Sequence, residues 1–170
     1  MSESPQPSNS SGAAGALRLW RLVKTQHIAS AFDGEGAFRY GGRWNSRGQR
    51  VVYASSTLSL AVLEVLVHLD PAGYLPELHA ISIDVPIEEI RTHHFSKQDS
   101  ISGGLPWQLA QTRAWGDVWA RERGRPALEV PSAIVPNESN YLLSPTHPRF
   151  AQLEISAPEQ FPIDARLFST

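Results

Sequence analysis

The amino-acid sequence predicts a single α+β domain in which mixed β-sheets are flanked by helices. Short runs of β-branched and aromatic residues alternate with two longer segments that have helical periodicity. The 170 residues suffice for one domain with a sizeable core, and two independent domains would be cramped. We expect residues 1–16 to be a disordered tail, because Ser, Pro, Gly and Ala dominate them, and residues 17–170 to form the domain.

Three strands are expected in the first half of the chain. Residues 17–23 and 50–54 are short and rich in apolar, β-branched and aromatic side chains. Residues 78–85 have the same character and end at Pro86, and we expect them to form the central strand. Between the first two strands, residues 32–45 contain four glycines among aromatic and charged residues. This mixture predicts a loop folded tightly around a ligand, because glycine lets the backbone come close to it.

Residues 58–69 predict a helix that contains an unusual charge. Hydroxyl residues at 55–57 offer an N-cap, and the helix is apolar around nearly its whole circumference, so we expect it to be buried on most sides. Glu64 must then be paired, shift its pKa or face a polar cleft. His68 lies one turn later and would border the same opening. The alternatives are a structural ion pair, for example between Glu64 and Arg43, and a His68 that is merely a satisfied helix residue.

The middle of the chain predicts a turn, a long loop and a second helix. Residues 86–90 suit a short helical turn, and residues 91–107 suit a loop. Residues 112–123 predict a helix with Gly124 as its C-cap. Its buried face is expected to carry Trp115, Val118 and Trp119.

The last third predicts short strands interrupted by prolines. Residues 126–136 read as strand, kink and strand, with Ser132 at the kink. The Ser132 hydroxyl either points into a cleft or satisfies the backbone that Pro131 disrupts. Residues 153–156 and 166–168 would close the sheet as edge strands.

Composition excludes several classes of function. The net charge of −2 and pI of about 6.3 argue against nucleic-acid binding through bulk charge. No cysteine is present, so the chain has no disulfide, thiolate metal site or cysteine nucleophile. His93 and His94 are adjacent and therefore diverge, so we expect no metal site. The apolar runs are too short to span a bilayer and no signal peptide is visible, so a cytoplasmic protein is expected.

Several motifs, read in order, resemble the RES domain family, which is named for an arginine, a glutamate and a serine. The resemblance extends from about residue 17 to residue 168. The motifs are Phe-Asp-Gly-Glu-Gly at 32–36, Gly-Gly-Arg-Trp-Asn at 41–45, Val-Tyr-Ala-Ser at 52–55, Leu-Ala-Val-Leu-Glu at 60–64, Pro-Ser-Ala-Ile-Val-Pro at 131–136 and Asn-Tyr-Leu-Leu at 140–143.

This resemblance implies the toxin of a bacterial type II toxin–antitoxin system, with an Xre-type helix-turn-helix antitoxin as its partner. It further implies a fold similar to ADP-ribosyltransferases, and NAD⁺ as a substrate that is consumed by phosphorolysis or hydrolysis; some members of the family transfer ADP-ribose to a protein instead. NAD⁺ would not be a hydride-carrying cofactor, because the chain lacks a Rossmann fingerprint. A homodimer within the toxin–antitoxin complex is a further expectation, without direct contact to nucleic acid or membrane.

By the same resemblance, the catalytic residues are Arg43, Tyr53, Glu64 and Ser132, and all four bind the substrate. The resemblance also places an arginine of the first strand in the pocket. Of the two candidates, Arg18 and Arg21, we expect it to be Arg21. A fixed carboxylate suits cleavage of the nicotinamide–ribose bond, because positive charge develops on the ribose. Arginines suit the diphosphate. The same residue types leave two other classes open, a ribonuclease and a non-catalytic nucleotide-binding module.

The roles of two of these residues remain open on residue type alone. Tyr53 could offer its aromatic face to nicotinamide or its hydroxyl to ribose, and its alternative role is core packing. Ser132 would donate to a phosphate or to the ribose. No nucleophile-elbow motif is visible, so Ser132 is not expected to be a nucleophile.

Overall fold

One mixed sheet of eight strands forms the body of the protein. The computed structural model describes residues 15–69, 76–92 and 108–168. The strands lie in the order β4-β5-β6-β2-β1-β3-β7, and β8 pairs with β3 as well. Among these pairs only β4 and β5 run parallel. The strands are β1 Ala16–Lys24, β2 Val52–Ser55, β3 Leu78–Pro86, β4 Ile90–Arg91, β5 Ala127–Pro131, β6 Ser139–Leu143, β7 Glu154–Ile155 and β8 Glu159–Phe161.

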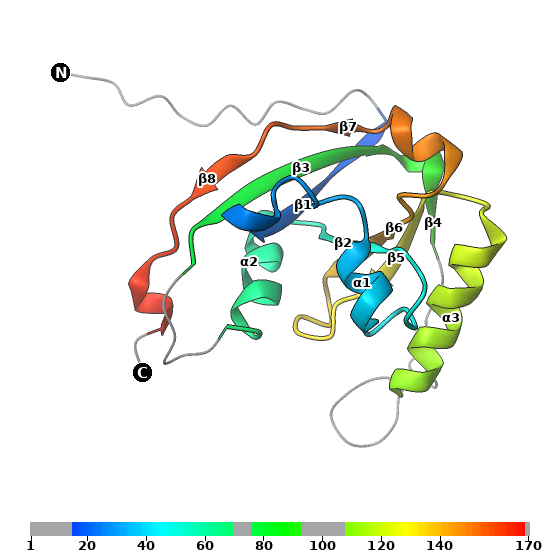
Figure 1. The fold of residues 1–170 in the computed structure, drawn as a ribbon, viewed down its shortest axis with the longest axis horizontal. Helices are drawn as coiled ribbons and strands as arrows, with labels where there is room; N and C mark the ends of the chain where they lie inside the picture. The colour runs from blue at the N-terminus through cyan, green and yellow to red at the C-terminus, as the bar shows by residue number, and fades with distance from the viewer. Residues whose placement is uncertain (1–14, 70–75, 93–107, 169–170) are drawn as a thin grey trace.

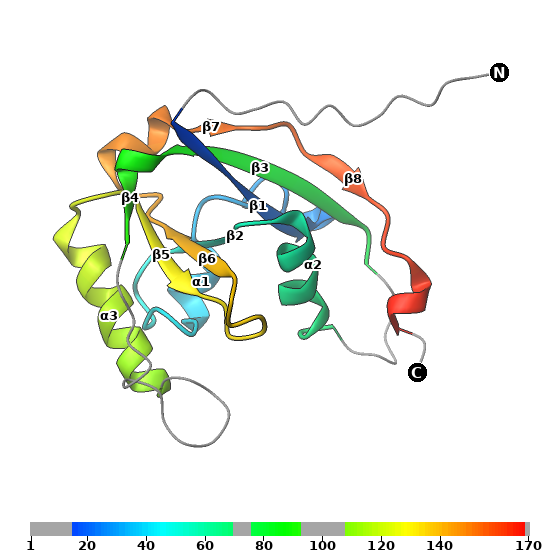
Figure 2. The ribbon, with the colours of Figure 1, turned by 180° about the vertical axis from the view of Figure 1, so that it is seen from behind.

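Three α-helices accompany the sheet in the described part of the chain: α1 (Glu35–Tyr40), α2 (Leu58–Leu66) and α3 (Leu109–Glu122). Figures 1 and 2 show β1 and β3 arching over α1 and α2, with α3 beside β4 and β5. Short 3₁₀ helices occupy Thr25–His27, Ile87–Glu89, Pro148–Gln152 and Ala165–Phe168. No helix in the described ranges is long and apolar enough to cross a membrane.

The sheet is tightly paired on one side of β1 and open on the other. β1 and β3 form a ladder of nine residue pairs, from Ala16 opposite Pro86 to Lys24 opposite Leu78. β1 and β2 share only the pair Trp20 and Ser55. Beyond this pair the two strands diverge, and the backbone groups that face the gap need other partners.

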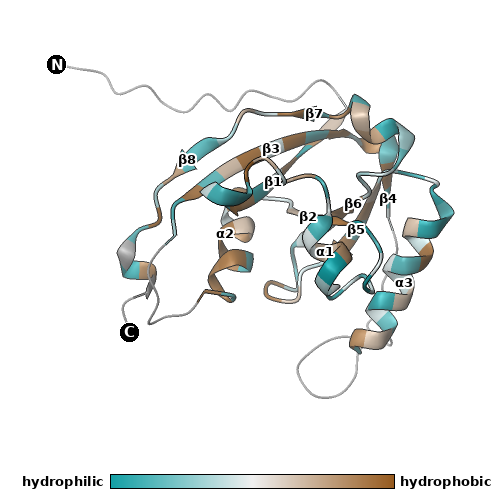
Figure 3. Ribbon diagram, in the orientation of Figure 1, coloured by the Kyte–Doolittle hydropathy of each residue, from teal (hydrophilic) through white to brown (hydrophobic). Residues whose placement is uncertain are grey.

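Apolar side chains of the sheet belong to separate clusters in the core. Leu22 of β1 and Ala80 of β3 pack with Ala61 and Val62 of α2. A second cluster joins the sheet to α3 and the loop before β2, and it comprises Trp44, Val51, Trp119, Leu128, Val130 and Leu142. Figure 3 shows the resulting pattern, with apolar residues along β3 and α2 and a mixture of polar and apolar residues along α3.

Most of the predicted elements are confirmed, although β3 lies away from the centre of the sheet. The predicted strands at 17–23, 50–54, 78–85 and 153–156 correspond to β1, β2, β3 and β7. The turn predicted at 86–90 is the 3₁₀ helix Ile87–Glu89. β3 lies between β1 and the short strands β7 and β8, so it is an interior strand near one end of the sheet. The prediction of a central strand was therefore wrong in position.

The prediction that α2 is buried on most sides was wrong. Thr57 caps this helix by accepting a hydrogen bond from the Leu60 amide at 3.1 Å, as expected of the hydroxyl residues there. Leu60, Ala61 and Val62 are buried, whereas Leu63 and the following Val67 are exposed. The helix packs on one face only, because its apolar composition does not dictate how many neighbours surround it.

Several smaller predictions also differ from the structure. The prediction of an uninterrupted loop at 32–45 was wrong, because that segment contains α1, and residues 133–135 form bends where a strand was predicted. Val118 is exposed, and Arg123 takes the left-handed conformation expected of Gly124. Residues 166–168 belong to a 3₁₀ helix, and the additional edge strand is β8. The loop predicted at 91–107 differs at its start, where Arg91 belongs to β4, and its residues 93–107, with His93 and His94, lie outside the described residues.

Candidate active site

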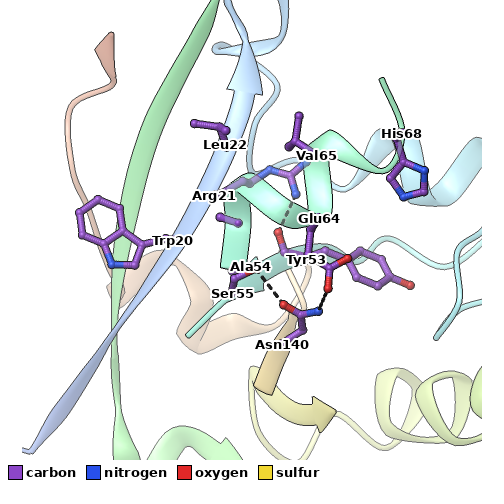
Figure 4. Close-up of a pocket in the computed structure, with 11 residues that line it drawn as sticks. Trp20, Arg21, Leu22, Tyr53, Ala54, Ser55, Glu64, Val65, His68 and Asn140 are labelled. Atoms are coloured by element: carbon purple, nitrogen blue, oxygen red, sulfur yellow. Dashed lines mark hydrogen bonds between the residues drawn. The ribbon is translucent and has the colours of Figure 1, made fainter. Parts of the chain in front are cut away.

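Two cavities meet at one group of polar side chains. Both are lined by Tyr53, Glu64, His68 and Asn140. The small cavity, of about 220 Å³, adds Arg21 and Ser55 together with the apolar residues Trp20, Leu22, Ala61 and Val65. The large cavity, of about 630 Å³, adds Gly41, Gly42, Arg43, Trp44, Val67, Leu109, Arg113, Ala133 and Ile134. Figure 4 shows Glu64 and Asn140 facing each other at the small cavity. The prediction that Glu64 and His68 border one opening is confirmed.

Glu64 is held by hydrogen bonds through one of its two oxygens. Asn140 Nδ2 donates to Glu64 Oε1 at 2.5 Å, and Ser132 Oγ donates to the same oxygen at 2.8 Å. Asn140 is itself held, since its Oδ1 accepts from Ser55 Oγ at 2.8 Å. Among the described residues, no cation lies within 4.0 Å of the Glu64 carboxylate. The structural ion pair between Glu64 and Arg43 is therefore not formed, and Oε2 is left available to a ligand.

Ser132 has a hydroxyl whose every bonding position is used. Its Oγ accepts from the Ile134 and Val135 amides, each at 3.1 Å, and donates its single hydrogen to Glu64. The side chain is completely buried. Of the two interpretations of the kink after Pro131, the structure confirms that the hydroxyl satisfies the backbone of the loop. Ser132 itself lines neither cavity and contacts the site through Glu64. A hydroxyl that already donates to a carboxylate and accepts two amides orients Glu64, and it has no hydrogen left for a ligand.

Tyr53 ties strand β2 to the glycine-rich loop. Its hydroxyl donates to Asn45 Oδ1 at 2.7 Å and accepts from the Trp44 amide at 3.1 Å. Burial raises the pKa of this phenol to about 12, and the Trp44 amide opposes the rise. A Cβ at Gly42 would collide with the Tyr53 hydroxyl, so this position needs glycine. The hydroxyl is therefore committed to the loop, and Tyr53 also lines both cavities.

Arg21 fills the gap where β1 and β2 diverge. Its Nη1 donates to the Tyr53 carbonyl oxygen at 2.7 Å, which replaces a missing ladder bond, as Figure 4 shows. Its Nε is buried without a hydrogen-bond partner among the described residues. Burial lowers the pKa of the guanidinium to about 10, and the charge of Asp33 opposes this. Arg18, the alternative in the same strand, instead forms an ion pair with Asp84 at 2.7 Å. Of the two arginines, Arg21 is the one that lines the small cavity.

Helix α3 fixes the loop that carries Arg43. Thr112 Oγ1 donates to the Arg43 carbonyl at 2.5 Å, and Arg113 Nε donates to the Gly42 carbonyl at 2.8 Å. The Ser46 amide donates to Asp117 Oδ1 at 2.9 Å. These three bonds hold consecutive parts of the loop against one helix. The Arg43 side chain, which lines the large cavity, is partly exposed and has no ion pair with the described residues.

All five residues predicted for the site line the cavities or bond directly to a residue that does. Sequence reasoning missed three contributors: Asn140, which holds Glu64, Asn45, which holds Tyr53, and Arg113, which lines the large cavity. Asn45 and Asn140 lie within motifs that carried the family resemblance, so their position was a usable signal. For Arg113, the sequence offered no signal other than the charge of the residue.

The arrangement suits stabilisation of a positive charge next to a bound anion. Glu64 lines both cavities, and its Oε2 has no hydrogen-bond partner among the described residues. Each cavity is also lined by at least one arginine. In the described residues no group of three or more histidine, aspartate and glutamate side chains could hold a metal ion. The polar groups that line the cavities include a carboxylate, guanidiniums, an imidazole and an amide, which can bind and stabilise charge.

Comparison with known proteins places the chain in a family. The family model described as "RES domain" matches residues 18–164. "Toxin Res" of Yersinia enterocolitica is 36% identical over 156 residues, which cover 89% of this chain and 99% of the relative. "Toxin Res" of Photorhabdus laumondii is 37% identical over 150 residues, covering 88% and 96%. The "Prs ADP-ribosylating toxin" of a Sphingobium species is 36% identical over 138 residues, covering 76% and 83%. The chain belongs to the RES domain family.

Proposed function

We propose that the protein is a toxin that consumes NAD⁺ by cleaving its nicotinamide–ribose bond. The observation that carries the proposal is the Glu64 carboxylate, held through Oε1 with Oε2 left available at the junction of two cavities that contain arginines. The toxins among its relatives support the same conclusion.

The proposed reaction develops positive charge on the ribose of NAD⁺. When the bond between C1 of the ribose and the nicotinamide nitrogen breaks, the electron pair leaves with nicotinamide, which becomes neutral. Positive charge then spreads over the ribose ring, and the Glu64 carboxylate stabilises it. Phosphate or water adds to C1 and completes the reaction. The leaving group needs no proton, which agrees with a site whose buried hydroxyls, Tyr53 and Ser132, are already engaged.

The arginines would hold the rest of the dinucleotide. Arg43 is partly exposed in the large cavity, where a guanidinium can form paired bonds with a phosphate. Arg21 lines the small cavity, and its buried Nε has no hydrogen-bond partner in the described part of the chain. The Tyr53 ring lies between the two cavities and offers a face on which a flat nicotinamide ring can stack.

The test is an assay of NAD⁺ products with purified protein, in buffer with and without phosphate. We expect release of nicotinamide, with ADP-ribose 1-phosphate as the second product of phosphorolysis and ADP-ribose as that of hydrolysis. Glu64→Gln should lower the rate at least about a hundredfold, because it removes the stabilising charge. Glu159→Gln is the matched control, since Glu159 is exposed on β8 and should keep full activity. NAD⁺ left intact by the wild-type protein, or full activity in Glu64→Gln, would reject the proposal.

Transfer of ADP-ribose to a protein is the second candidate activity. The printed name of the Sphingobium relative, an ADP-ribosylating toxin, favours it. It uses the same cleavage and differs in the acceptor. Incubation with labelled NAD⁺ and a cell lysate would show label on a protein band if this activity exists, and only small-molecule products if it does not.

A toxin of this kind also implies a partner that restrains it. We propose an Xre-type helix-turn-helix antitoxin, acting on the protein in the cytoplasm, in a complex that contains a toxin homodimer. Co-expression with the product of a neighbouring helix-turn-helix reading frame should relieve toxicity. Light scattering of the purified complex would then give its stoichiometry, and one copy of the toxin per complex would contradict the homodimer.

A further inference from the structure

The large cavity is electropositive although the protein is acidic. The chain has a formal net charge of −2. Of the described residues that line this cavity, Arg43 and Arg113 are permanently charged cations and Glu64 is the only carboxylate. Glu64 can neutralise only one of these two cations. The remaining positive charge attracts an anionic group to the cavity.

Arg113 uses only a fraction of its hydrogen-bonding capacity inside the protein. A guanidinium has five N–H donors, and Arg113 spends the one on Nε on the Gly42 carbonyl at 2.8 Å. No carboxylate of the described residues lies within 4.0 Å of it. Asp117, one turn further along α3, is engaged by the Ser46 amide. The terminal Nη groups of Arg113, in a partly exposed side chain, are therefore available to a ligand in the cavity.

Arg43 and Arg113 are held on one unit. The Gly42 and Arg43 carbonyls accept from two consecutive residues of α3, Arg113 and Thr112. Gly116, one turn later, lies against the Trp44 carbonyl so closely that a Cβ there would collide with it. The helix and the loop thus hold the Arg113 guanidinium and the backbone of Arg43 in place before any ligand arrives, which reduces the ordering that binding would otherwise require.

We propose that Arg113 is a phosphate-binding residue that acts together with Arg43 on one phosphate anion in the large cavity. This inference rests on the proposed function, which supplies two sources of that anion: the diphosphate of the dinucleotide, and inorganic phosphate as the acceptor. Both present tetrahedral phosphate oxygens that a guanidinium can contact in pairs.

The competing explanation is that Arg113 only anchors the loop through Gly42. Arg113→Gln separates the two roles, because the glutamine amide nitrogen can occupy the position of Nε and keep the Gly42 bond, while the charge and the Nη groups are lost. Thr112→Val is the matched control, since it removes the neighbouring loop anchor to Arg43 and changes no charge.

The experiment measures, by calorimetry, binding of ADP-ribose, adenosine and inorganic phosphate to the full-length protein and these variants. We expect Arg113→Gln to weaken ADP-ribose binding by about tenfold to a hundredfold and to leave adenosine binding unchanged. Thr112→Val should weaken ADP-ribose binding far less. If only inorganic phosphate binds more weakly to Arg113→Gln, the anion is the acceptor phosphate and the residue assignment still holds.

Unchanged binding of both ADP-ribose and inorganic phosphate in Arg113→Gln overturns the proposal, as does an equal loss in Thr112→Val. Arg113→Lys serves if Arg113→Gln does not fold: an ammonium keeps the charge but cannot form the paired contact, so ADP-ribose affinity should fall by roughly threefold or more. Wild-type affinity in Arg113→Lys would then overturn it. Because binding needs no turnover, a protein that binds ADP-ribose through Arg113 and leaves NAD⁺ intact would refute only the proposed function.

Discussion

At the scale of single residues, the site is organised by hydrogen-bond donors that are themselves held in place. The Ser132 hydroxyl accepts two amides and so can give its hydrogen only to Glu64. Asn140 accepts from Ser55 and turns its amide nitrogen to the same carboxylate oxygen. Glu64 is thus fixed in orientation by neighbours that are themselves fixed, which is what a carboxylate must have if it is to stabilise charge at one point in space.

Ser132→Ala should therefore lower catalysis and stability together. The variant removes the acceptor of the Ile134 and Val135 amides and frees Glu64 to rotate, so we expect a loss of about 1–3 kcal/mol in the free energy of unfolding. The kcat for NAD⁺ cleavage should fall roughly tenfold to a hundredfold, as measured by nicotinamide release. Ser139→Ala is the control, because its hydroxyl bonds to Glu129 and lies outside both cavities. Wild-type kcat in Ser132→Ala would contradict the positioning role.

At the scale of elements, α3 acts as the support of the glycine-rich loop. Thr112, Arg113 and Asp117 lie on one side of the helix and each bonds to a backbone group between Gly42 and Ser46. The rings of Trp44 and Trp115 stack with their centroids 6.3 Å apart. The position of Arg43 thus depends on a helix about seventy residues away in the sequence.

Gly116→Ala tests this dependence. Alanine normally favours a helix over glycine by about 1 kcal/mol. Here the new Cβ would collide with the Trp44 carbonyl, which belongs to the backbone and cannot easily move. We expect a net destabilisation of about 1–3 kcal/mol, measured by urea unfolding, and loss of NAD⁺ cleavage.

Gly124→Ala is the matched control for this substitution. It lies just beyond the same helix, and a Cβ there would meet no atom within 4 Å. Its stability and activity should stay close to those of the wild type. A Gly116→Ala protein as stable and as active as Gly124→Ala would show that the loop does not depend on close packing against α3.

The elements also show where sequence patterns were sufficient. The boundaries of β1, β2 and β3 follow from runs of β-branched and apolar residues, and the N-cap of α2 follows from Thr57. The exposure of Leu63 and Val118 did not follow, because periodicity identifies an apolar face and not the neighbour that would cover it. The apolar residues at 133–135 predicted a strand, because β-branched residues favour strands. These residues form bends instead, since the Ser132 side chain accepts hydrogen bonds from the Ile134 and Val135 amides.

At the scale of the whole molecule, stability should depend on alkaline pH through buried tyrosines. Burial raises the pKa values of Tyr53 and Tyr141 to about 12, above the usual value of about 10. The folded state therefore binds more protons than the unfolded state between these values. The stabilisation from each neutral phenol is fully present below pH 10 and is lost as the pH rises through 12.

Comparison with Tyr53→Phe isolates one of these contributions, because Tyr141 and Arg21 are common to both proteins. The difference in free energy of unfolding between wild type and Tyr53→Phe should shrink by about 1–2 kcal/mol between pH 9 and pH 11.5. Chemical denaturation across this range measures it. A constant difference for Tyr53→Phe would mean that its hydroxyl ionises in the folded protein as readily as in the unfolded chain.

The sequence by itself determined the single α+β domain, most of its strands and helices, and the family motifs that carry Arg43, Tyr53, Glu64 and Ser132. These features depend on local patterns and on residue types that can be recognised in the amino-acid sequence. Only the tertiary structure decided that β1 and β2 diverge around Arg21, that Asn140 holds Glu64, and that α3 brings Arg113 to the large cavity. Each of these is a contact between segments far apart in the chain, set by strand order and close packing, and no local pattern encodes it.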